Sequence, residues 1–174
     1  MSRIARSAAP AIMILAAVGF LASLITHVAA RLAGWAAPKP VIAVLHIGAI
    51  AITFVTIPLT RMLSADYPQR ELWTATFRGC PSWMRIALKI FFAYGICNFI
   101  LFMILAPHHG NAATGLLGWG FSGHWMIFYS VAFATAWSAR SVLVADPHRR
   151  CPMGHPVSSS AQFCERCGER VAKF

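Results

Sequence analysis

The sequence predicts an all-α integral membrane protein with four transmembrane helices and a small C-terminal metal-binding module. Hydrophobic residues make up 58% of the 174 residues and charged residues only 11%, whereas charged residues are about 25% of an average soluble domain. Four apolar segments span residues 8–30, 41–63, 86–106 and 120–144, and a cluster of cysteine and histidine follows. We therefore divide the chain into a transmembrane domain, 1–147, and a C-terminal module, 148–174.

The first apolar segment has two interpretations. It follows Arg3 and Arg6, and residues 28–30 would fit the cleavage site of a signal peptide. Its apolar run is long for a signal peptide and close to the roughly 20 residues that cross a bilayer. We therefore expect an uncleaved helix.

The other three segments have the same length and apolar character. In the second, Pro58 lacks a backbone N–H and is expected to kink the helix. In the third, Tyr94 and Asn98 lie four residues apart on one helix face, which is expected to join the interior of the bundle. At the start of the fourth, Trp119, just before the segment, and Trp125 fit an aromatic belt at the outer interface.

The charges predict the orientation of these helices. Arg31 and Lys39 lie on one side of the predicted membrane, and the other thirteen of the fifteen lysine and arginine residues lie on the opposite side. The positive-inside rule then places both termini in the cytoplasm, with the helices in the cytoplasmic (inner) membrane. The same asymmetry accounts for the net charge of +10, so nucleic-acid binding is not expected.

The C-terminal module carries two pairs of metal-ligand residues. Cys151 and His155 are separated by three residues, and Cys164 and Cys167 by two, with a glycine in each half. Such spacing allows two tight turns, which need the positive φ of glycine, to present two ligands each to one Zn²⁺ ion. Because four protein ligands leave no open position, the predicted zinc is structural. A lone CxxC redox pair is the alternative interpretation.

The stretches CPMGH and FCERCG resemble the short zinc-ribbon family. The resemblance covers the C-terminal module only, and it differs from the common four-cysteine form because His155 would be the fourth ligand. It implies a small cytoplasmic zinc ribbon. So short a segment cannot bury a core of its own, and the metal would supply its folding energy. We expect Val157, Phe163 and Val171 to cover the metal.

Histidines gather on the other side of the membrane. With both termini inside, His27, His46 and His124 lie in the outer halves of three helices, and His108 and His109 lie in the outer loop. Small and polar residues recur every three or four positions beside two of them, as in helix–helix contacts within membranes. The members of the two stripes are Gly19, Ser23, Thr26, His27 and Ala30, and His46, Ala49, Thr53, Thr56 and Thr60. We therefore expect His27 and His46 to point into the bundle.

Besides a quinone site or a proton path, these histidines have two interpretations. Imidazole binds iron, copper and zinc, so His27, His46 and His124 could hold a second metal or a haem b. No CxxCH motif is present, so a haem would be bound non-covalently. Alternatively, the neutral rings form hydrogen bonds between helices and stabilise the bundle.

The polar connection 64–83, with Trp73, Phe77 and Trp83, is predicted to lie on the inner membrane surface as an amphipathic helix.

The stretches GWGFSGHWMIFYS and RGCPSWMR resemble bacterial four-helix inner-membrane proteins without an assigned activity.

The first function we consider is an interaction or assembly module, which binds a protein partner at the cytoplasmic face. The second is a haem- or metal-dependent redox or metal-handling protein, and the third is a small transporter or channel. No Ser-His-Asp set or carboxylate pair supports an enzyme. Stripes of small residues are compatible with a homo-oligomer.

Overall fold

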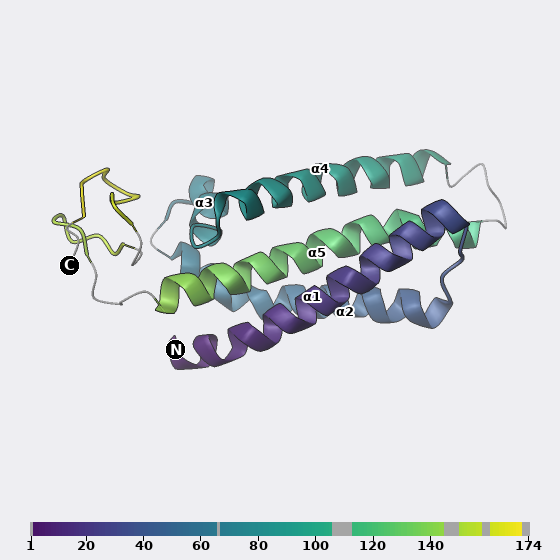
Figure 1. The fold of residues 1–174 in the computed structure, drawn as a ribbon, viewed down its shortest axis with the longest axis horizontal. Coiled ribbons are helices and arrows are strands. Elements are labelled where there is room, and N and C mark those ends of the chain that lie inside the picture. Colours follow the sequence, from purple (N-terminus) through teal and green to yellow (C-terminus); the bar gives the residue numbers. More distant parts are fainter. Residues whose placement is uncertain (1, 66, 106–112, 145–149, 158–160, 172–174) are drawn as a thin grey trace.

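In the computed structural model, four long helices run side by side (Figure 1). They are α1 (Ser2–Ala33), α2 (Lys39–Ser64), α4 (Ser82–Leu105) and α5 (Ala113–Val144). A 3₁₀ turn, η1 (Gln69–Glu71), and the short helix α3 (Leu72–Thr76) join α2 to α4. The structure describes residues 2–65, 67–105, 113–144, 150–157 and 161–171, without the side chains of 2–6, 113–119 and 143–144.

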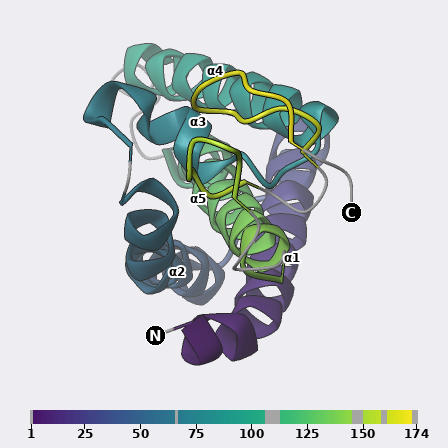
Figure 2. The ribbon, with the colours of Figure 1, turned by 90° about the vertical axis from the view of Figure 1, so that its left-hand side faces the viewer.

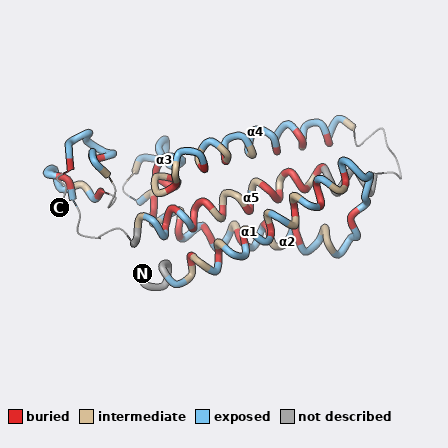
Figure 3. Tube along the Cα trace, viewed as in Figure 1, coloured by how far each residue is buried: buried red, intermediate tan, exposed pale blue. Residues whose placement is uncertain are grey.

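Three of the helices are long and apolar enough to cross a membrane: α1 from Ser7 to Ala33, α2 and α4. Large apolar side chains cover their outward faces, among them Ile14, Ile25, Val44, Phe54 and Ile90. The exposed colouring along these helices in Figure 3 follows the same outward faces. A soluble protein would bury such residues, whereas a membrane protein places them against lipid.

Helix α5 lies between the other three and contacts α1, α2 and α4 (Figure 2). Its contact surface consists mainly of small residues, and the buried ones are Gly120, Ser122, Gly123, Ala132, Ala134, Thr135, Ala136, Ser138 and Ala139. Small side chains let helix backbones approach closely, which favours association inside lipid. The stripe predicted for α1 is confirmed, since Gly19, Ser23, Thr26, His27 and Ala30 are all buried.

Glycines mark the closest approaches between helices. The Tyr129 ring occupies the space that a Cβ at Gly19 would need, and its hydroxyl lies against Gly48. The same hydroxyl donates a hydrogen bond to the Leu45 carbonyl at 3.1 Å. One tyrosine of α5 is therefore fixed between α1 and α2 by shape and by a hydrogen bond.

The connection 64–83 packs more deeply than the predicted surface helix. Phe77, expected among the lipid headgroups, is only 3% exposed and lies with Cys80 against α5. The backbone N–H of Gly79 donates to Ser138 Oγ at 3.0 Å, and the Cys80 thiol donates to the Ala134 carbonyl at 3.2 Å. Burial raises the pKa of the Cys80 thiol to about 11, so it stays protonated as a structural residue. Trp83 and Trp73 are exposed, and their position at the membrane surface stays a prediction.

Two boundaries also differ from the sequence prediction. Helix α1 begins at Ser2, so Arg3 and Arg6 belong to the helix itself. Helix α5 begins at Ala113, within the predicted outer loop, and ends at Val144, six residues before the described part of the module. The pattern of apolar residues locates the middle of a helix better than its ends, because a helix continues wherever its backbone hydrogen bonds can form.

We predict that Gly95→Leu destabilises the bundle by about 1–3 kcal/mol, the usual cost of overpacking. A Cβ at Gly95 would overlap the Ile127 side chain and lie 3.1 Å from the Gly123 carbonyl, which cannot rotate away. Ala93→Leu, on the exposed face of the same helix, is the matched control. Thermal unfolding followed by tryptophan fluorescence in detergent should show a lower midpoint for Gly95→Leu only. Equal midpoints would contradict the packing described for α4 and α5.

Candidate metal centre

The first half of the module is a tight turn, the first knuckle, residues 150–157. The Gly154 N–H donates to the Cys151 carbonyl at 2.8 Å, and the Cys151 N–H donates to the His155 carbonyl at 2.9 Å. Gly154 has a φ of 79°, which residues with a side chain rarely adopt. The predicted need for glycine in this turn is therefore confirmed.

The second knuckle, residues 161–171, repeats this arrangement with one additional residue. The Gly168 N–H donates to the Cys164 carbonyl at 2.9 Å, and the Cys164 N–H donates to the Glu169 carbonyl at 2.7 Å. Gly168 has a φ of 72°, as its role in the turn requires. One isolated antiparallel β-bridge closes each knuckle, Arg150 with Pro156 and Phe163 with Arg170. The described part of the module is thus two paired turns, with bridges in place of extended strands.

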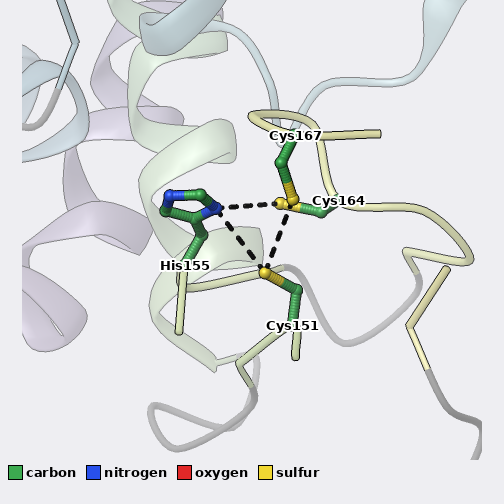
Figure 4. Close-up of side chains that lie close together, drawn as sticks. All are labelled: Cys151, His155, Cys164 and Cys167. Carbon is green, nitrogen blue, oxygen red and sulfur yellow. Dashed lines mark hydrogen bonds between the residues drawn. The ribbon is translucent and has the colours of Figure 1, made fainter. Parts of the chain in front are cut away.

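The two knuckles bring four ligand atoms to one point (Figure 4). The ligand atoms of Cys151, His155, Cys164 and Cys167 all lie within 4.8 Å of one another. Cys151 Sγ is 3.7 Å from Cys167 Sγ and 3.6 Å from His155 Nδ1, and Cys164 Sγ is 3.8 Å from His155 Nδ1. The three cysteines belong to no disulfide. This Cys₃His group could bind a metal ion such as zinc.

The separations of the ligand atoms fit a tetrahedral ion. With metal–sulfur bonds of about 2.3 Å and metal–nitrogen bonds of about 2.0–2.1 Å, the edges of a tetrahedron are about 3.8 Å between sulfurs and about 3.5 Å between sulfur and nitrogen. The observed values of 3.6–3.8 Å are close to these edges. Three of the six ligand separations therefore match the edges of a tetrahedral metal site, and the other three are no longer than 4.8 Å.

Cys164 is poised to act as a thiolate. Burial opposes its ionisation, but the backbone N–H groups of Arg166 and Cys167 and the neighbouring thiols lower the pKa of Cys164 to about 6. The Arg166 N–H lies 3.4 Å from Cys164 Sγ. Because the thiolate is the form that coordinates a metal, the turn itself assists metal binding.

A small apolar cluster surrounds the ligands. Val157 and Val171 are buried with Cys151 and Cys164, as predicted. The prediction for Phe163 is wrong, since its side chain is 58% exposed. Phe163 precedes Cys164 in the extended part of the knuckle, where successive side chains point to opposite sides. With Cys164 directed to the ligand group, Phe163 points outward.

The module lies at the end of the bundle that carries the α2–α4 connection (Figures 1 and 2). Tyr67 belongs to this connection, and the Arg78 guanidinium stacks on its ring at 5.1 Å. Burial raises the pKa of Tyr67, Arg78 opposes the shift, and charges on Glu165 and Cys164 add to it. Charges of the second knuckle therefore act on this connection. Arg78 also donates to the carbonyls of Leu63 and Ala75, which ties the connection to α2.

The structure gives His27 two hydrogen-bond partners on different helices. His27 Nδ1 lies 2.8 Å from Ser122 Oγ of α5, and Nε2 lies 2.5 Å from Tyr94 Oη of α4. The side chain is 6% exposed. Asn98, on the same helix as Tyr94, donates from Nδ2 to the Gly120 carbonyl at 3.1 Å. His27 thus joins three helices, and a metal would have to displace one of its partners.

His46 and His124 have different surroundings. His46 is exposed, yet it points toward α5 as predicted, since its Nδ1 accepts a hydrogen bond from Trp125 Nε1 at 3.1 Å. Indole N–H is a donor only, so the proton of neutral His46 lies on Nε2, which then has no lone pair for a metal. His124 Nδ1 is buried and has no hydrogen-bond partner in the described part of the chain. The Phe121 ring packs near both imidazoles, at 5.8 and 6.4 Å between ring centroids.

These contacts favour the interpretation of His27 and His46 as links between helices, although a second metal or haem site stays a prediction. Within the described residues, the Cys₃His group is the one place where three or more potential ligands meet. Sequence reasoning did not identify Ser122 or Trp125 as partners, because no local spacing relates them to the histidines. Comparisons of the chain with protein-family models, curated proteins and solved structures find no match.

We predict that Gly154→Val and Gly168→Val each weaken zinc binding by about 5- to 30-fold, because a left-handed backbone costs a side-chain-bearing residue about 1–2 kcal/mol. Competition with a chromogenic chelator measures this change. Met153→Val alters the neighbouring residue, whose φ is not positive, and is the control. Unchanged affinity in both glycine variants would show that the turns are not needed to form the site.

We predict that His27→Phe lowers the stability of the bundle by about 1–3 kcal/mol, because buried Ser122 and partly exposed Tyr94 each lose a hydrogen bond. Tyr94→Phe, which removes one of the two bonds, should cost less. Thermal unfolding in detergent and the metal content of both variants are measured together. Loss of bound iron or copper at unchanged stability would instead identify His27 as a metal ligand.

Proposed function

We propose that this chain is a membrane-anchored zinc-ribbon protein, which acts as an interaction or assembly module at the cytoplasmic face of the inner membrane. The observation that carries the proposal is the convergence of Cys151, His155, Cys164 and Cys167 on one point. It occurs directly after a set of helices that are long and apolar enough to cross a membrane. The zinc-ribbon resemblance of CPMGH and FCERCG points the same way.

The proposed anchor is a four-helix transmembrane bundle with both termini in the cytoplasm. Helix α5 would be the fourth span, and its central position among α1, α2 and α4 supports this assignment. The charge asymmetry in the sequence supports the orientation. A reducing cytoplasm would also keep the three cysteine ligands in the thiol or thiolate form.

A structural role for the metal follows from the number of ligands. Three cysteines and one histidine complete a tetrahedron, which leaves no position for a water molecule or a substrate. The apolar cluster around them consists of two valines and one alanine beside the cysteines, which is too little to stabilise a fold without the ion. The product of metal binding would then be a rigid surface.

That surface carries features suited to a protein partner. Met153 is 69% exposed and Phe163 is 58% exposed, and Glu165 and Arg166, two and three residues after Phe163, are exposed as well. Exposed large apolar residues among charged ones are typical of protein-binding sites. We infer that the partner contacts Met153 and Phe163, whose side chains have no role in holding the metal.

We predict one zinc per chain in the detergent-purified protein, measured by inductively coupled plasma mass spectrometry. Cys164→Ser should lose the zinc and the cytoplasmic partner captured by crosslinking, while the helical circular dichroism is kept. Cys97→Ser removes an exposed thiol of α4 and should retain both. Met153→Ala with Phe163→Ala should keep the zinc and lose the partner. Zinc loss without any change in captured partners would contradict the proposed role.

A further inference from the structure

A second candidate site lies at the start of α4. It is a cavity of about 250 Å³ between α3 and the first two turns of α4, which lie beside each other in Figures 1 and 2. Its lining residues are Trp73, Thr74, Ser82, Arg85, Ile86 and Lys89. This cavity is separate from the metal ligands and from the histidines of the outer half.

Two cations share one wall of the cavity. Arg85 and Lys89 lie four residues apart on α4 and therefore project from the same helix face. Within the described residues, the one ion pair joins Arg70 and Glu71 at 3.7 Å. Neither Arg85 nor Lys89 therefore has a carboxylate partner among those residues. Two cations without a carboxylate partner at one cavity favour an anion as its ligand.

The remaining polar groups favour phosphate among anions. Thr74 and Ser82 bring hydroxyl groups to the same cavity as the cations. Arginine matches the oxygen geometry of a phosphate, lysine contributes a point charge, and hydroxyls donate to the remaining oxygens. A phosphate has enough acceptor oxygens for all four side chains.

Apolar groups complete the cavity and argue for a lipid. Trp73 and Ile86 line it together with the cations, and α4 continues from it as an apolar span. Trp83, next to Ser82, is 66% exposed, and exposed tryptophan is typical of the headgroup region. Lys89 can extend its charge toward that region along its apolar stem. A ligand with a charged head and apolar chains fits this combination better than a soluble phosphate.

We propose that the cavity between α3 and α4 binds the phosphate headgroup of an anionic phospholipid from the adjoining leaflet. Arg85 and Lys89 would contact the phosphate, Thr74 and Ser82 would donate to it, and Trp73 and Ile86 would contact the glycerol and upper acyl chain. The inference rests on the membrane placement proposed above and is independent of the metal. Its failure is distinguishable from failure of the metal proposal because zinc content is unaffected by these residues.

The test is native mass spectrometry of the full chain, titrated in detergent with phosphatidylglycerol or phosphatidylcholine. We expect one phosphatidylglycerol to bind more tightly than phosphatidylcholine. Each of Arg85→Gln and Lys89→Gln should weaken that binding about fivefold, and the double variant about 30-fold. Arg70→Gln with Arg140→Gln removes two exposed cations outside the cavity and should bind as the unmodified chain does.

The variant Arg85→Lys with Lys89→Arg keeps both charges and is the control for misfolding. It should bind the lipid with an affinity within a few-fold of that of the unmodified chain. Equal affinity for both lipids, or full binding by the double glutamine variant with its zinc retained, would overturn the proposal. Displacement of the lipid by millimolar inorganic phosphate alone would also overturn it, since the site would then recognise soluble phosphate. Resistance to that competitor, with selective loss in the double variant, supports the lipid site.

Discussion

The packing of the helices depends on the small side chains on the surface of α5. Inside a bilayer, helices gain little from burying apolar groups, so they associate where their backbones can approach closely and where polar groups meet. The alanines and small polar residues of α5 permit that approach to α1, α2 and α4. The hydrogen bonds of His27, Asn98 and Tyr129 then link α5 to all three neighbours. Larger side chains on α5 would separate α1, α2 and α4, whose direct contacts with one another are fewer than the contacts that they make with α5.

The C-terminal module is held together by different interactions from those of the helices. It has few apolar residues, and its two knuckles contact each other mainly through the ligand side chains. A metal ion there would take the place of a hydrophobic core. The bundle is therefore stable without the metal in our account, whereas the module is not. The Tyr67–Arg78 stack lies at the same end of the bundle as the module.

The features that the sequence predicted well are local. The metal ligands depend on spacings of two and three residues, and the buried stripe of α1 depends on helix periodicity, so both could be read from neighbouring positions. Features that depend on packing between distant segments were missed. Phe77 was assigned to the membrane surface because nothing nearby indicates Ala134 as its neighbour. His46 continues the predicted stripe of α2, yet it is exposed at the edge of the contact with α5. Its exposure depends on the angle at which α2 crosses α5, which the sequence of α2 does not contain. The cavity at Arg85 and Lys89 required the position of α3 as well.

The short connection between α5 and the first knuckle has a further consequence. From Val144 to Arg150 the chain has six peptide steps, which can span at most about 20 Å. Confinement to such a radius gives tethered groups an effective concentration in the millimolar range. A weak attraction between the module and the end of the bundle that carries the α2–α4 connection would then be enough to hold the two together. A partner competing for the same surface of the module would have to exceed that local concentration, so the length of this tether, as much as the chemistry of the surface, would set the threshold for recruitment.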